Sequence, residues 1–146
     1  MSLITHKKIG LLYETKESIE AGLELRGYEA KSLSSSLGSL EGTKIIIRGG
    51  EAFVIGMYIP PYQPANTPKS YDPYRVRRLL LSKKEILKLA SQIEGTGLLI
   101  VPVSIYKNRR LKMQIALVRK KNKEDKREAI RARDDKKEMR KVIFGE

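Results

Sequence analysis

Residues 98–117 read LLIVPVSIYKNRRLKMQIAL, and this stretch predicts two paired β-strands. Its first part, residues 98–106, is almost continuously apolar, which is typical of a strand buried on both faces. Its last part alternates, with apolar side chains at Leu111, Met113, Ile115 and Leu117. Alternation of this kind predicts a strand with one buried face. The polar residues 107–110 join the two strands as a hairpin.

A second hairpin is predicted upstream, in residues 43–59, TKIIIRGGEAFVIGMYI. Gly49 and Gly50 separate two runs rich in β-branched and aromatic residues, and a tight primed turn requires the positive φ that glycine adopts. In the second strand of this hairpin, four large apolar side chains fall on one face. We therefore expect one face of that strand to be core, with the side chains of Phe53, Ile55, Met57 and Ile59.

The remaining segments predict one more long strand, two helices and a loop. Residues 11–25 predict the strand, and residues 27–36 a turn and a short helix. Residues 75–93 predict a longer helix, in which Ser82 and Glu85 have the spacing of a capping box. Apolar residues then recur on one helical face at Ile86, Leu89, Ala90 and Ile93. Residues 60–73 hold five of the six prolines and predict an irregular surface loop, either functional or without a task.

Several strands with one long helix predict a mainly β fold, a small OB-type barrel with peripheral helices. Residues 1–118 would form this domain. Residues 119–146 carry twelve basic and seven acidic residues and few apolar ones, so they cannot build a core of their own. We expect this basic C-terminal tail to be disordered in the free protein and helical when bound.

The composition narrows the possible functions. The chain has no cysteine and one histidine, His6, which excludes disulfides, thiolate chemistry and a cluster of histidine ligands within one chain. We expect His6 to be a solvated residue of a frayed terminus, and we predict no catalytic residue, cofactor or metal. There is no apolar run of membrane-spanning length and no signal peptide at the N-terminus, which predicts a cytoplasmic protein.

A formal net charge of +13 points to a polyanionic partner, with nucleic acid favoured over an anionic membrane surface. The densest basic cluster of the first 118 residues lies beside the proline-rich loop and is interleaved with tyrosines. Such a cluster suits phosphate contacts and stacking on unpaired bases, although a solvated helix end would look the same. The cluster comprises Tyr71, Tyr74, Arg75, Arg77, Arg78, Lys83 and Lys84.

Four stretches, in order, resemble the SsrA-binding (SmpB) family. They are EAGLELRGYEAKSL at residues 20–33, DPYRVRRLLL at 72–81, VPVSIY at 101–106 and DKRE at 125–128. The similarity covers residues 6–134, and the four motifs together are highly specific. The resemblance implies an OB-type barrel that binds the tRNA-like domain of transfer-messenger RNA (tmRNA) near its elbow.

The resemblance also implies particular residues. Family positions for RNA binding fall on Glu20, Leu80 and Lys112, and we add the basic and aromatic candidates Lys31, Tyr71, Arg75, Arg77, Arg78, Lys120 and Lys121. Without the resemblance, a leucine at position 80 would more often be a core residue. The tail is implied to enter the mRNA channel of a stalled ribosome as a helix, with Asp125, Lys126 and Arg127 as its ribosome-binding residues. A monomer without enzymatic activity is expected.

The chain departs from the family in two places near the tail. Lys120, Lys121 and Asn122 replace a Gly-Lys-Lys run, and Glu124 replaces an aromatic residue or histidine. A carboxylate cannot stack on a base, so contacts at the decoding centre would differ. Two other classes of function remain open: a structural RNA-binding protein of ribosomal type, and an RNA-modifying or RNA-cleaving enzyme, which the composition disfavours.

Overall fold

The structure is a computed structural model that describes residues 2–122, 127 and 130–133. Within these residues the elements are β1 (Ser2–Thr5), α1 (Ile9–Leu12), β2 (Tyr13–Leu23), α2 (Gly27–Ser34), β3 (Lys44–Arg48), β4 (Glu51–Ile55), the 3₁₀ turn η1 (Pro64–Asn66), β5 (Arg77–Leu80), α3 (Lys83–Ile93), β6 (Leu98–Asn108) and β7 (Arg110–Lys120). Residue 127 and residues 130–133 are helical.

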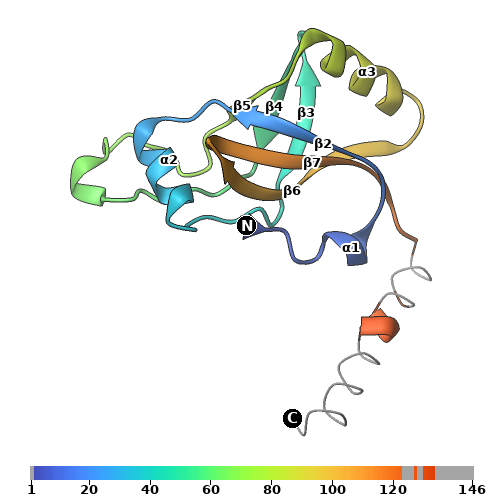
Figure 1. The fold of residues 1–146 in the computed structure, drawn as a ribbon, viewed down its shortest axis with the longest axis horizontal. Coiled ribbons are helices and arrows are strands. Elements are labelled where there is room, and N and C mark those ends of the chain that lie inside the picture. Colours follow the sequence, from blue (N-terminus) through green and yellow to red (C-terminus); the bar gives the residue numbers. More distant parts are fainter. Residues whose placement is uncertain (1, 123–126, 128–129, 134–146) are drawn as a thin grey trace, which may run out of the picture.

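The strands form an antiparallel sheet that closes on itself. Their order is β1-β6-β3-β4-β5-β2-β7, and β7 also pairs with β6, so six strands make a ring while β1 adds to β6. The main apolar core fills this ring, and α2 and α3 lie at opposite ends of it (Figure 1). The prediction of a mainly β, OB-type fold with peripheral helices is confirmed.

The hairpin of β6 and β7 forms as its sequence predicts. Arg109 takes a positive φ of 65° at the turn, between the paired residues Asn108 and Arg110. The alternating residues of β7 point into the main core, while Val101 of β6 belongs to a second, smaller cluster on the other side. Burial on both faces of β6 explains its continuous apolar sequence.

The second hairpin forms at Gly49 and Gly50, but the face predicted for its second strand is half wrong. In β4 it is Ala52 and Val54 that are buried, and Phe53 and Ile55 are only partly buried. The strand ends at Ile55, and Gly56 follows with a φ of 83°, which shifts the alternation by one residue. Met57 and Ile59 beyond this point are buried as expected. A side chain at residue 56 would collide with the backbone of Gly42, 2.9 Å away.

The helix predicted for residues 75–93 is wrong in its first part. Residues Arg77–Leu80 form β5, which pairs with β4 and β2, and α3 begins only at Lys83. The Ser82 hydroxyl accepts the Glu85 N–H at 3.2 Å, which confirms the capping box. Arg77 and Leu79 point inward and Arg78 and Leu80 outward, so this segment has the two-residue period of a strand.

The N-terminus is ordered rather than frayed. Strand β1 pairs with the end of β6, and the His6 N–H donates to the Val103 carbonyl at 2.8 Å. Neither β1 nor α1 is predictable from the sequence, because each is only four residues long and is held by tertiary contacts. At the other end, β7 continues to Lys120, two residues past the predicted end of the domain at residue 118.

Candidate nucleic-acid interface

The register of the strands brings the family positions together on the outer face of the barrel. Gly22 of β2 pairs with Leu80 of β5 on one side and with Lys112 of β7 on the other. Lys112 in turn pairs with Tyr106 of β6. A single row therefore crosses four strands, from Leu80 through Gly22 and Lys112 to Tyr106.

Glu20 joins this row from the next outward position of β2. Its carboxylate accepts a hydrogen bond from the Tyr106 hydroxyl, which fixes the acid against the ring. Partial burial and the hydrogen bond to Glu20 raise the pKa of the Tyr106 hydroxyl to about 12. The hydroxyl therefore remains a donor to Glu20 at neutral pH.

Leu80, Gly22 and Lys112 of this row line a groove of about 430 Å³ between the sheet, helix α2 and the β6–β7 turn, with Leu80 and Gly22 in its floor and Lys112 at its rim. Its described lining residues are apolar or basic except for the neutral polar Ser34, and none of them is acidic: Gly22, Leu23, Leu25, Ala30, Ser34, Leu80, Lys107, Arg110, Leu111 and Lys112. Gly22 keeps the floor low, because a Cβ there would lie 3.1 Å from the Leu80 Cβ.

Such a groove suits an unpaired nucleotide. Lysine and arginine at its rim can neutralise phosphates, and the apolar floor can receive the face of a base. Leu80 is 45% exposed in the floor and is not a core residue, which gives its place in the family motif a physical explanation.

Arg77 has a different role from the one predicted. Its side chain is fully buried, and its Nε donates to the Glu29 carboxylate at 2.7 Å. The rest of the guanidinium donates to the carbonyls of Met57 and Pro73 and to the Tyr71 hydroxyl. With no surface exposed, Arg77 cannot contact RNA in this conformation, and its predicted RNA contact is corrected to a structural one.

Glu29 is the centre of this buried network. Its carboxylate also accepts from Arg75 at 2.5 Å and from the backbone N–H of Arg26 at 2.9 Å. Burial opposes ionisation of Glu29, but the bonds from Arg75, Arg26 and Arg77 together outweigh burial and lower its pKa. The sequence analysis did not single out Glu29, since a lone glutamate in a short helix carries no signal of burial.

Tyr71 and Arg75 belong mainly to the same network. The Tyr71 hydroxyl lies 2.7 Å from the Ile59 carbonyl, and burial together with the charge of Glu29 raises its pKa to about 12. The Tyr71 ring packs edge-on against Tyr28, with centroids 4.9 Å apart. The Arg75 side chain is 27% exposed, so it retains some surface for a partner.

The other predicted RNA-binding residues lie at the surface. Arg78 points outward but is paired with Glu24 at 3.0 Å and Glu51 at 3.1 Å, and Lys31 is exposed on α2. Lys120 is exposed at the end of β7, whereas the Lys121 ammonium donates to the Gly10 carbonyl at 2.7 Å. In the predicted tail site Arg127 is helical and exposed, and Asp125 and Lys126 lie outside the described residues.

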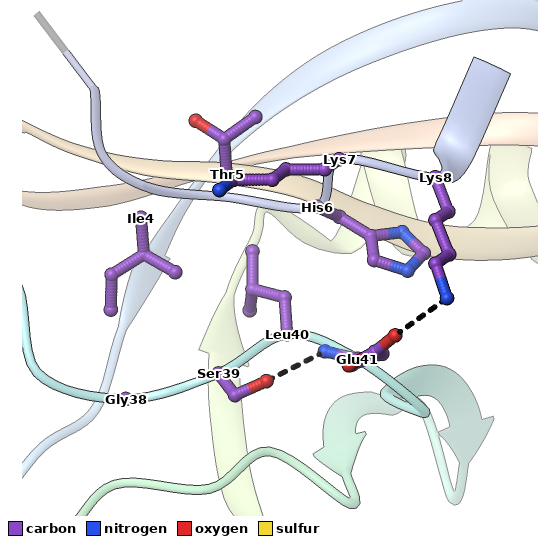
Figure 2. Close-up of a pocket in the computed structure, with 9 residues that line it drawn as sticks. All are labelled: Ile4, Thr5, His6, Lys7, Lys8, Gly38, Ser39, Leu40 and Glu41. Carbon is purple, nitrogen blue, oxygen red and sulfur yellow. Dashed lines mark hydrogen bonds and ion pairs between the residues drawn. The ribbon is translucent and has the colours of Figure 1, made fainter.

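A second hollow, of about 290 Å³, lies between β1 and residues 38–41 (Figure 2). The His6 ring forms one wall, and Lys8 pairs with Glu41 at 3.4 Å across its mouth. Burial lowers the pKa of His6, so the ring is neutral at pH 7. His6 is half-buried and its N–H is bonded to β6, so it is not the solvated residue of a frayed terminus that we expected.

Comparison with known proteins identifies the family. The family model described as SmpB protein matches residues 3–144. The chain belongs to the SmpB family. Among SmpB relatives, the SsrA-binding protein of Persephonella marina is 46% identical over 91% of this chain and 88% of its own length. That of Sulfurihydrogenibium sp. is 44% identical over 97% and 93%.

A solved structure supports the same assignment. A chain from a study of tmRNA–SmpB and the center of the bacterial ribosome superposes with a TM-score of 0.68 and 35% identity. The match covers 88% of this chain and 94% of that chain. Within the described part of this SmpB-family chain, no helix is both long and apolar enough to cross a membrane.

Proposed function

We propose that this chain binds the tRNA-like domain of tmRNA and delivers it to stalled ribosomes, where trans-translation tags the incomplete peptide. The observation that carries the proposal is the row of Leu80, Gly22 and Lys112 across three strands, with Glu20 held beside it by Tyr106. Membership of the SmpB family, whose relatives are named SsrA-binding proteins, supports the same reading.

The groove would bind RNA through two kinds of contact. Lys107, Arg110 and Lys112 contact phosphates around the rim, and the floor at Gly22 and Leu80 receives an unstacked base. Glu20 supplies an acceptor that Tyr106 holds in place, suited to a base N–H or a ribose hydroxyl. Phosphate contacts give sequence-independent affinity, and the floor and Glu20 provide selection for a particular loop shape.

The C-terminal segment would make the ribosomal contacts. In this proposal the segment that follows Lys121 enters the mRNA channel as a helix, where Lys126 and Arg127 contact ribosomal RNA and Asp125 orients them. The high proportion of basic residues in this segment suits a channel lined with phosphates. The protein would act as a cytoplasmic monomer and as an adaptor, not as an enzyme.

The proposal is tested by sequencing the RNA that co-purifies with the tagged protein. One dominant small RNA with a tRNA-like end is expected. Ribosomal RNA in stoichiometric amounts that resists high salt would instead indicate a structural ribosomal protein, and turnover of the bound RNA would indicate an enzyme.

A matched pair of variants then locates the site. Lys112→Met removes a rim cation of the groove, whereas Lys44→Met removes an exposed cation of β3 that does not line it. Loss of one phosphate contact should make the salt dependence of binding shallower by about 0.7–0.9 in the slope of log K against log salt. The proposal fails for this groove if the two variants change the slope equally.

A further inference from the structure

Helix α1 lies beside the end of β7, at the point where the C-terminal segment begins (Figure 1). Two hydrogen bonds join them. The Lys121 backbone N–H donates to the Leu12 carbonyl at 3.0 Å, and the Lys121 ammonium donates to the Gly10 carbonyl at 2.7 Å. One residue thus binds α1 with both its backbone and its side chain.

These bonds use carbonyls that α1 itself cannot satisfy. A helix of four residues leaves its last carbonyls without partners inside the helix, and a lysine near the C-terminal end can supply a donor. The Tyr13 N–H, at the C-cap, donates to the Ile9 carbonyl. Lys121 donates hydrogen bonds to the carbonyls of Gly10 and Leu12, so it caps the C-terminal end of α1.

Helix α1 is itself fixed to the barrel by a separate apolar cluster. Ile9 and Tyr13 pack on the face of β6 and β7 that points away from the main core. The buried members of this cluster are Val101, Ala116 and Val118. The anchor of α1 is therefore on the strands from which the C-terminal segment leaves, so α1 cannot move without disturbing them.

Two further contacts hold the neighbouring residues. Lys120 pairs with Tyr13 in the β2–β7 ladder, and the Arg119 guanidinium lies 2.5 Å from the Glu14 carboxylate. Hydrogen bonds from Lys16 and Arg119 lower the pKa of Glu14 to about 2, so this pair remains charged at neutral pH. Residues 119–121 are thus each held to the segment from Ile9 to Glu14.

We propose that α1 is a bracket that fixes the starting point and direction of the C-terminal segment, with Lys121 as its positioning residue. This inference rests on the proposed function, in which that segment enters the ribosome. It assigns the Lys121 ammonium to an intramolecular bond, in contrast to a phosphate contact, while the exposed Lys120 remains available to RNA.

The inference is tested on the full chain with Lys121→Met, which keeps the length of the side chain but removes the donor. Lys120→Met is the matched control, since it removes the same charge one residue earlier. The chain has no cysteine, so spin labels attached through Thr15→Cys and Arg131→Cys report the distance from β2 to the C-terminal segment. Binding of the tRNA-like domain and tagging of stalled ribosomes are measured in parallel.

In Lys121→Met, the fraction of molecules whose label distance differs from the main distance of the native chain should rise about tenfold. This is the factor expected from the loss of one charge-assisted hydrogen bond. Lys120→Met should leave the distances as in the native chain. Tagging by Lys121→Met should fall while its binding of the tRNA-like domain persists.

Two results would overturn the bracket: unchanged label distances in Lys121→Met, or equal changes in both variants. If Lys121→Met and Lys120→Met weaken RNA binding equally and leave the label distances unchanged, Lys121 makes a phosphate contact instead. Failure of the native chain to bind or tag would refute the proposed function alone, because the distances would still test the bracket.

Discussion

Arg77 and Arg78 are adjacent in β5 and both pair with glutamates, yet their surroundings differ completely. The Arg77 side chain is 0% exposed and binds Glu29, which is equally buried, whereas the Arg78 side chain is 43% exposed and bridges Glu24 and Glu51. The strand places one inside the barrel end and the other outside it. Removing one member of a buried pair leaves an uncompensated charge, while an exposed pair is screened by water.

The comparison shows that basic residues adjacent in a sequence need not form a single basic surface. The run from Arg75 to Arg78 has the composition of a nucleic-acid site. In the structure Arg77 instead ties β5 to α2 through Glu29 and to the proline-rich loop through Tyr71. Since Ala30 and Ser34 of α2 and Leu80 of β5 all line the groove, this network joins two of the elements that form it. Under the proposed function, Arg77 would support RNA binding without touching RNA.

The largest effect is expected from breaking the buried pair. Arg77→Met should lower the free energy of unfolding by about 3–5 kcal/mol, because the buried Glu29 carboxylate and the carbonyls of Met57 and Pro73 would each lose a donor. Arg78→Met should cost less than about 1 kcal/mol. Urea unfolding of both variants measures the difference, and similar losses would show that the two arginines are energetically equivalent.

The second prediction concerns acid stability. The folded pKa of Glu29 lies below the ordinary value of 4.5, so ionised Glu29 contributes stability above that pH, and this contribution is lost as pH falls through the folded pKa. The native chain should therefore lose more stability between pH 5 and the acid limit of folding than Glu29→Gln does. Parallel pH dependences in the unfolding of the two proteins would contradict this role for Glu29.

Much of the barrel was predictable, because its strands carry local patterns. The alternation in β7, the glycine pair between β3 and β4 and the capping box of α3 each specify an element without reference to the rest of the chain. The segments predicted wrongly are those that depend on distant partners. Arg77–Leu80 is a strand only because β2 and β4 lie on either side, and β1 only because β6 offers a free edge.

The candidate site divides in the same way. The outward position of Lys112 follows from alternation in β7, and the family motifs gave Glu20 and Leu80. Neither pattern predicts that Gly22 lies between Leu80 and Lys112, or that Tyr106 holds Glu20, since both depend on the register between strands far apart in sequence. The buried state of Arg77 required knowing that residues 77–80 are a strand.

A third prediction sharpens the contrast at the surface. Arg78→Met frees Glu24 and Glu51, which then present unpaired negative charges beside the exposed Leu80. Affinity for the tRNA-like domain should fall severalfold at low salt and less at high salt, because screening weakens interactions between exposed charges. Lys88→Met is a suitable control, as it removes the ion pair of a single half-buried glutamate, Glu17, outside the groove. Equal losses from both variants would indicate a general effect of net charge.

The smallest effects are expected from removing two tyrosine hydroxyls, one in the buried network of Arg77 and one near the surface like Arg78. Each has a pKa raised to about 12 and lies against a glutamate, Tyr71 in the buried network and Tyr106 at the edge of the groove. Tyr71→Phe removes a hydroxyl that accepts from Arg77, so it should destabilise the fold by about 1–3 kcal/mol. Tyr106→Phe should cost about 1 kcal/mol or less, because water can replace its bond to the exposed Glu20.

RNA binding should show the reverse order. Glu20 without the Tyr106 hydroxyl samples several rotamers, and ordering it again on binding costs about 0.5–1.5 kcal/mol, or up to tenfold in affinity. The Tyr71 hydroxyl is bonded within the protein to the Ile59 carbonyl and to Arg77, so Tyr71→Phe should retain affinity at temperatures where it is folded. Calorimetric unfolding paired with RNA titration separates the two quantities. If Tyr106→Phe binds normally, Glu20 does not need to be held in place, and its role in the groove is that of a freely moving acceptor.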